Sequence, residues 1–132
     1  MAIDIPIYVH SSALAKLVVL EPETRALAEH LRNRRLITSE LAIIEVVRAE
    51  KLAEPERTTG ATTRGVLAEA DLVPLGQAVL ARASELTSRR VRPLDAIHLA
   101  TALDIEPDEL VAYDHRLLEA AEEAGLRTAS PR

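Results

Sequence analysis

The sequence predicts an α/β fold built from βαβ units around a parallel sheet. Short apolar runs rich in β-branched residues alternate along the chain with longer segments of helical pattern. The length of 132 residues suits a single domain, taken here as residues 1–132, and is enough to bury a core without disulfides. Cysteine is absent, which excludes thiolate metal sites and a cysteine nucleophile.

Charge and aromatic content narrow the possible functions. The chain has 16 Lys and Arg against 21 Asp and Glu, and its net charge of -5 argues against a nonspecific polyanion binder, although a local basic patch remains compatible. The only aromatic residues are Tyr8 and Tyr113, too few for a base-stacking platform. No apolar run is long enough to span a membrane and the N-terminus does not resemble a signal peptide, so a cytoplasmic location is expected.

The N-terminal half is predicted to begin with a strand followed by capped helices. Residues 5–9 are apolar and β-branched, as in a buried strand, and Ser11 or Ser12 can cap a helix over 13–20. The later elements expected in this half are a break at 21–24, a helix to about Arg34, a short strand at 36–38 and a helix over about 40–54, capped by Ser39 and ended by Pro55.

The C-terminal half continues the alternation of helices and strands. The elements expected are a loop or weak helical start at 58–63, a helix over 64–70, a strand at 72–75, a helix over 76–88, a basic loop at 89–92, a helix from Pro93 to about Asp104, a strand at 110–113, a helix over 115–124 and a strand at 126–128. Gly125 is the expected stop of the 115–124 helix. In such sheets ligands bind beyond the carboxyl ends of the strands.

Glu45 is the first of three acids in unusual positions. It lies inside the predicted 40–54 helix, and its neighbours at three, four and seven residues are mostly apolar, including Leu41 and Leu52. An acid on an apolar stripe is costly unless it is paired or binds a metal. The alternative is a salt bridge to Arg48 on a partly exposed face.

Asp95 and Asp114 are each expected at a helix start. Asp95 falls in the first turn after Pro93, where an acid complements the helix dipole, and Asp114 is placed as a helix N-cap. These structural roles explain each residue about as well as a functional role does. Together with Glu45, however, the two acids can meet at one end of a parallel sheet. Clustered carboxylates favour a cation, here Mg²⁺ or Mn²⁺, which can activate water.

Four blocks of this sequence resemble the PIN-domain ribonucleases, in particular the VapC-type toxins of toxin–antitoxin pairs. The blocks are IYVHSSALAKL at 7–17, TSELAIIEVVRA at 38–49, LDAIHLATA at 94–102 and AYDHRL at 112–117. The resemblance covers nearly the whole chain and implies a three-layer α/β/α domain with a short parallel sheet of about four to five strands. It also implies a metal-dependent endoribonuclease toxin that hydrolyses RNA, a VapB-type antitoxin partner and a homodimer.

The resemblance assigns candidate site residues, with one departure. Family members hold Mg²⁺ or Mn²⁺ with four acids, and three of these positions correspond to Glu45, Asp95 and Asp114, with Ser11 as a hydroxyl contact near the metal. The fourth position is occupied by His10 instead of an acid. An imidazole nitrogen suits Mn²⁺ or zinc better than Mg²⁺, and the replacement removes one negative charge from the site. His10 is therefore expected in the site, unless it is an ordinary histidine at the end of a strand.

His10 leaves three explanations open. The histidine could be a natural substitution that weakens a nuclease or alters its metal. It could instead belong to an inactive family member that is kept for binding its partner, or it could be an engineered substitution that inactivates the enzyme. The alternative function is accordingly a non-catalytic PIN-like module that binds an antitoxin or RNA.

Three arginines and two further histidines also have expected places, either near the site or outside it. Arg89, Arg90 and Arg92 directly precede Asp95 and are the candidates for contacting the RNA backbone, with a solvated loop as the equal alternative. His98 and His115 are expected as surface or capping histidines outside the site.

Overall fold

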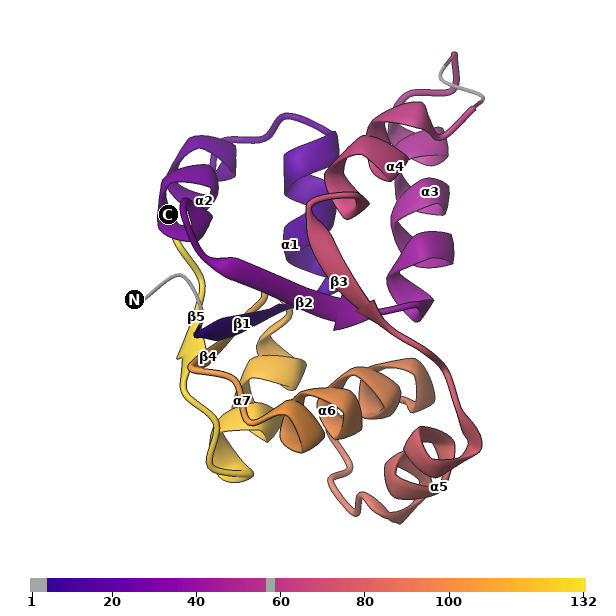
Figure 1. Ribbon diagram of the computed structural model, residues 1–132, viewed down its shortest axis with the longest axis vertical. Coiled ribbons are helices and arrows are strands. Elements are labelled where there is room, and N and C mark those ends of the chain that lie inside the picture. Colours follow the sequence, from indigo (N-terminus) through magenta and orange to yellow (C-terminus); the bar gives the residue numbers. More distant parts are fainter. Residues whose placement is uncertain (1–4, 57–58) are drawn as a thin grey trace.

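The computed structural model describes residues 5–56 and 59–132 (Figure 1). The elements are β1 (Pro6–Val9), α1 (Ser11–Val18), α2 (Thr24–Leu31), β2 (Arg35–Ser39), α3 (Leu41–Ala53), α4 (Ala61–Leu67), β3 (Ala70–Val73), α5 (Gln77–Glu85), α6 (Pro93–Ile105), β4 (Glu109–Val111), α7 (His115–Glu123) and β5 (Thr128–Ala129). The N-terminal tetrapeptide, on which the expectation about a signal peptide rested, and residues 57–58 lie outside this description.

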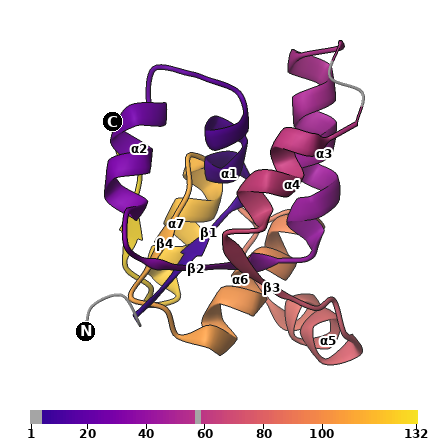
Figure 2. The ribbon, with the colours of Figure 1, turned by 45° about the horizontal axis from the view of Figure 1, so that its top comes forward.

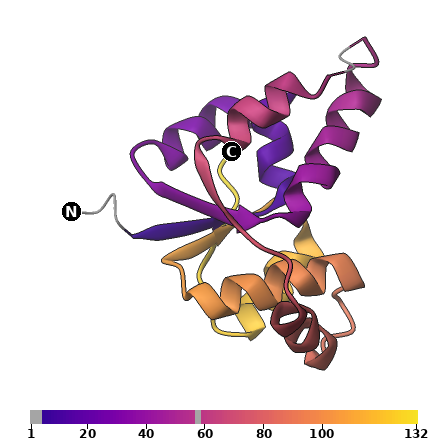
Figure 3. The same ribbon diagram turned by 45° about the vertical axis from the view of Figure 1, so that its right-hand side comes forward.

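The five strands form one sheet in the order β3-β2-β1-β4-β5, and every neighbouring pair is parallel. Helices α1 to α4 lie on one face and α5 to α7 on the other, as the views in Figures 1, 2 and 3 agree. The predicted three-layer α/β/α architecture with a short parallel sheet is therefore confirmed. Among the described residues, no helix has the length and apolar character needed to cross a membrane.

Strand β1 lies at the centre of the sheet and is buried on both faces. Ile7 and Val9 pack into the core under α1 to α4, whereas Tyr8 points to the opposite core with Leu99 and Leu110. This alternation follows from the pleat of a strand. A central parallel strand must be apolar on both sides, which is why residues 5–9 were recognisable as a strand.

The predicted helix at 64–70 and strand at 72–75 lie two or three residues earlier in the structure, at α4 and β3. Gly60 adopts a left-handed conformation with φ of 69° and starts α4 at Ala61. Strand β3 pairs with β2 from Ala70 to Val73, and Pro74 has no N–H with which to extend that ladder.

The last two strands also differ from the sequence-based boundaries. Strand β4 ends at Val111 rather than at Tyr113, because the Tyr113 backbone N–H leaves the sheet and donates to Ser12 Oγ. At the end of α7, Gly125 has φ of 95° and the Leu126 N–H donates to the Ala121 carbonyl, which closes the helix. Strand β5 therefore begins only after this turn.

Truncation of a core side chain tests the packing around β1. Leu14 on α1 is fully buried, so Leu14→Ala is expected to lower the free energy of unfolding by about 2–5 kcal/mol, because apolar packing is removed and a cavity remains. Leu20 is 84% exposed, and the matched variant Leu20→Ala is expected to stay within about 0.5 kcal/mol of the parent chain. Urea unfolding measures both, and equal effects would contradict this core.

Candidate active site

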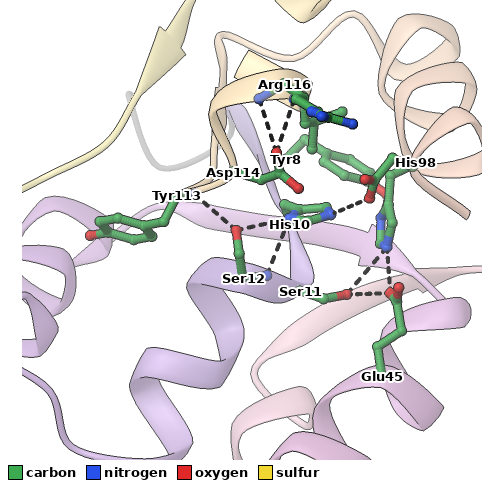
Figure 4. A network of polar contacts seen from close by, with 11 residues as sticks. Tyr8, His10, Ser11, Ser12, Glu45, His98, Tyr113, Asp114 and Arg116 are labelled. Carbon is green, nitrogen blue, oxygen red and sulfur yellow. Dashed lines mark hydrogen bonds and ion pairs between the residues drawn. The ribbon is translucent and has the colours of Figure 1, made fainter. Parts of the chain in front are cut away.

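The candidate site lies at the carboxyl edge of the sheet, where residues far apart in sequence meet (Figure 4). His10 follows β1, and its backbone N–H donates to the Val111 carbonyl of β4 at 3.0 Å. Asp114 comes shortly after β4, at the same edge. Glu45 is supplied by α3 and Asp95 by the first turn of α6, as its position after Pro93 predicted.

His10 is held on both ring nitrogens. Its Nε2 lies 3.0 Å from Asp95 Oδ1, and its Nδ1 lies 2.8 Å from Ser12 Oγ and 3.2 Å from the Ser12 backbone nitrogen. His10 is thereby the N-cap of α1, the role predicted for Ser11 or Ser12. The prediction was wrong because the imidazole nitrogen reaches the Ser12 N–H. The residue is only 5% exposed, so it is part of the site's interior.

Glu45 is held by a second imidazole. The His98 Nε2 lies 2.7 Å from Glu45 Oε1, and the Ser11 hydroxyl donates to the same oxygen at 2.5 Å. The other ring nitrogen of His98 lies 2.7 Å from the Tyr8 hydroxyl. Glu45 is thus paired as an acid on a mostly apolar helix must be, but with His98 and Ser11 rather than with Arg48.

The prediction that His98 lies outside the site was wrong. It is 0% exposed and lies between Tyr8 and Glu45, with its ring centroid 4.5 Å from that of His10. The available signal was its spacing of three residues from Asp95, which puts both side chains on one face of α6. His115 starts α7 and is exposed, as expected.

Asp114 performs the structural role that the sequence allowed for it. Its Oδ1 accepts hydrogen bonds from the backbone N–H groups of Arg116 at 3.0 Å and Leu117 at 3.3 Å, which makes it the N-cap of α7. The second carboxylate oxygen of Asp114, Oδ2, takes no part in capping the helix. Capping and ligand binding are therefore compatible for Asp114.

Neighbouring groups shift the pKa values of the paired residues. The hydrogen bond from His10 holds the pKa of the Asp95 carboxyl below its usual value, although burial opposes this. Burial raises the pKa of the Glu45 carboxyl, but hydrogen bonds from His98 and Ser11 outweigh that effect, and the net pKa is lowered. Burial lowers the pKa of the His98 imidazole and raises that of the Tyr8 phenol. Both carboxyl groups are therefore ionised at neutral pH.

The present arrangement of these groups does not fit a shared divalent cation. Within residues 5–56 and 59–132, no three His, Asp or Glu side chains are grouped so that they could hold one ion. Asp95 and Glu45 each already have an imidazole nitrogen within hydrogen-bond distance of one oxygen. The assignment of Glu45, Asp95, Asp114 and His10 as metal ligands thus stays a prediction, and it requires side chains to move.

The arginines of the basic loop before α6 are exposed, but they differ in whether they form ion pairs with other described residues. Arg90 forms ion pairs with Glu119 and, at 3.4 Å, with Glu123 on α7. Arg92 precedes α6 as its N-cap residue and helps to lower the pKa of Asp95. Arg89 is exposed in the same loop. Arg89 and Arg92 are therefore more available to an external phosphate than Arg90.

A groove of about 420 Å³ adjoins Glu45 between α3 and the start of α6. It is lined by Ile44, Glu45, Arg48, Ala49, Leu52 and Leu94. Three of these lining residues are large, exposed apolar side chains, namely Ile44, Leu52 and Leu94. An apolar rim with Arg48, beside the Glu45 carboxylate, is a surface suited to a partner chain.

Comparison with known proteins gives a consistent family. The family model of the PIN domain matches residues 7–123. The chain is 41% identical over 128 residues to ribonuclease VapC46 of Mycobacterium tuberculosis, a match that covers 95% of this chain and 97% of that relative. It is 38% identical over 133 residues to ribonuclease VapC47 of the same species, covering 95% and 96%.

Solved structures show the same fold at lower identity. The crystal structure of M. tuberculosis VapC20, described as a toxin that cleaves the sarcin–ricin loop, has a TM-score of 0.71 at 14% identity and covers 95% of this chain and 99% of that one. A toxin–antitoxin complex from Klebsiella pneumoniae has a TM-score of 0.70 at 19% identity, with 96% and 98% covered.

The pKa shifts predict loss of stability in acid in two stages. A histidine whose folded pKa is lowered, as for His98, contributes stability that is complete above its unfolded pKa of 6.5 and is lost as pH falls below it. The lowered carboxyl pKa values of Asp95 and Glu45 add a second loss below their unfolded values of 3.8 and 4.5. Urea unfolding between pH 8 and pH 3, a range chosen to bracket these values, measures both stages.

A variant of His98 tests whether this histidine causes the first loss of stability. The decline below pH 6.5 is expected to shrink in His98→Gln and to persist in His115→Gln, whose side chain is exposed. A free energy of unfolding that is constant or rises on acidification through that range would contradict the burial of a neutral His98.

Proposed function

The chain belongs to the VapC-type proteins of the PIN-domain family, and from that membership we propose that it is an endoribonuclease toxin of a toxin–antitoxin pair. The substrate would be RNA, cleaved by hydrolysis of a phosphodiester bond, and the place of action would be the cytoplasm. What supports the proposal is the position of the three acids near the carboxyl edge of the sheet, where α/β folds bind ligands: Asp95 and Glu45 are held by the adjoining rings of His10 and His98, and Asp114 follows β4.

The proposed activity depends on Mg²⁺ or Mn²⁺, with the three acids as the candidate ligands. A divalent ion lowers the pKa of bound water and stabilises charge on phosphate. In this chain the contact of His10 with Asp95 competes with such binding, and an imidazole replaces a carboxylate among the donors. We therefore expect the unmodified chain to be a weak nuclease.

The proposed partner is a VapB-type antitoxin, and the proposed assembly is a homodimer. The groove beside Glu45 supports a protein partner, because its rim carries exposed Ile44, Leu52 and Leu94. A segment bound there would lie beside the Glu45 carboxylate, and an acidic group of that segment could pair with Arg48. A relative in fold was solved as a toxin–antitoxin complex.

The second candidate function is a non-catalytic PIN-like module that binds an antitoxin or RNA. It is favoured by one observation: the His10 ring nitrogen lies 3.0 Å from the Asp95 carboxylate, which the proposed chemistry requires to be free. The two functions differ in whether the present chain cleaves RNA at all.

Replacing His10 separates the two functions. His10→Asp restores a fourth carboxylate and frees Asp95, so it is expected to raise Mg²⁺-dependent RNA cleavage by at least about 10²-fold, within the range that one positioned group contributes. The measurement is cleavage of purified total RNA followed on a denaturing gel. The double variant His10→Asp/Asp95→Asn is the control and is expected to lose that gain. If His10→Asp folds but does not cleave RNA, the nuclease proposal is wrong for this chain.

The role of the basic loop in RNA binding is tested by the dependence of RNA affinity on salt concentration. Replacing Arg89, Arg90 and Arg92 with Ala is expected to flatten the dependence of single-stranded RNA binding on salt, by a slope of about 0.7 for each phosphate that the loop neutralises. Because Arg90 is paired with α7, most of the change is expected from Arg89 and Arg92.

A matched triple variant controls for net charge. The exposed arginines Arg25 on α2, Arg32 just after α2 and Arg35 at the start of β2 lie outside the basic loop, and their replacement with Ala removes the same charge. Equal slopes for the two triple variants would remove the basic loop from the RNA interface.

A further inference from the structure

The proton positions on His10 follow from its hydrogen-bond donors. The Ser12 backbone N–H donates to Nδ1, so that nitrogen acts as an acceptor. Ser12 Oγ, which accepts the Tyr113 N–H at 2.9 Å, lies 2.8 Å from the same nitrogen, and its own proton is available to point toward Nδ1. The ring proton is therefore on Nε2, and it is donated to Asp95 Oδ1.

The proton on His98 is placed by the same rule. Glu45 accepts only, so the His98 Nε2 at 2.7 Å must carry the proton. The buried Tyr8 hydroxyl then donates to Nδ1 on the other side of the ring. Ser11 adds a second donor to the same Glu45 oxygen. His98 is thus a positioning residue for Glu45, fixed by a tyrosine on β1.

Two half-buried carboxylates therefore receive an imidazole N–H each. Their side chains are 21% exposed, whereas those of His10 and His98 are 6% and 0% exposed. Ionised groups in such surroundings require charge-assisted hydrogen bonds or a cation, and here the N–H groups supply the compensation. The two rings pack edge to face at 4.5 Å, so the pairs form one unit.

We propose that His10 and His98, both as Nε2–H tautomers, replace a cation at this site, so that the chain folds into a stable resting state that has little affinity for Mg²⁺. The inference deepens the proposed function, on which its relevance to RNA cleavage rests. The resting arrangement itself is tested without RNA. In this state His10 occupies Asp95 Oδ1, and Mg²⁺, which coordinates oxygen and not an N–H group, reaches that oxygen only by displacing the hydrogen bond.

The unmodified chain gives the first test. Long-range ¹H–¹⁵N NMR correlations at neutral pH are expected to show the Nε2–H pattern for His10 and His98. An Nδ1–H tautomer at either residue would overturn the proposal. His115, whose side chain is exposed, is the internal reference.

Cation binding gives the second test. EDTA and Mg²⁺ at about 10 mM are each expected to change the thermal midpoint of the unmodified chain by less than about 1 °C, since no bound ion is lost or gained. In His10→Asp the same Mg²⁺ is expected to raise the midpoint by about 5 °C. A Mg²⁺ response in the unmodified chain, or none in a folded His10→Asp protein, would overturn the proposal.

Two control variants separate charge from hydrogen bonding. His10→Asn can still cap α1 but adds no charge, and is expected to be destabilised without gaining a Mg²⁺ response. Asn33→Asp adds the same charge at an exposed turn with φ of 59°, and is expected to behave like the parent. A Mg²⁺ response in either control equal to that of His10→Asp would overturn the proposal.

Measurements of Mg²⁺ binding and of RNA cleavage also distinguish the failure of the resting-state proposal from the failure of the ribonuclease proposal. If His10→Asp gains Mg²⁺ binding but cleaves no RNA, the resting state is supported and the ribonuclease proposal fails. If the unmodified chain binds Mg²⁺ and cleaves RNA, the ribonuclease proposal stands and the resting state is wrong.

Discussion

The burial of β1 on both faces is the constraint on which the site depends. Because Ile7, Tyr8 and Val9 are enclosed by two cores, the strand has one possible register between β2 and β4. Its end delivers His10 to the edge where β4 also ends. The same strand supplies Tyr8, whose hydroxyl fixes His98 from below the site. Packing and polar geometry are therefore set by one element.

Ionic groups at this edge are satisfied in pairs rather than around a common centre. Asp95 with His10, and Glu45 with His98, each combine a carboxylate with an imidazole nitrogen at hydrogen-bond distance. Asp114 instead satisfies the start of α7. A carboxylate that is already compensated gains less from a cation than an uncompensated one, so residue 10 has a direct influence on what the site can bind.

Much of the fold was accessible from the sequence because its signals are local. Continuous apolar character marked β1, and Pro93 marked the start of α6, with Asp95 in its first turn. The boundaries of α4 and β3 were missed because the left-handed Gly60 and the pairing with β2 set them, and neither is visible in periodicity. Within the site, the acids could be named from their odd positions. The partners of Glu45 could not, because Ser11 and His98 are brought to it only by tertiary packing.

The pairing of β1 with β4 has a consequence for synthesis of the protein. Tyr8 pairs with Leu110, about a hundred positions later in the chain, so the central strand has neighbours on both sides only after Leu110 has left the ribosome. At about 5–20 residues per second, that interval is several seconds or longer. A nascent chain that ends before Leu110 therefore carries His10 and Glu45 while β4 and Asp114 have yet to be added, and the site is assembled only after their synthesis.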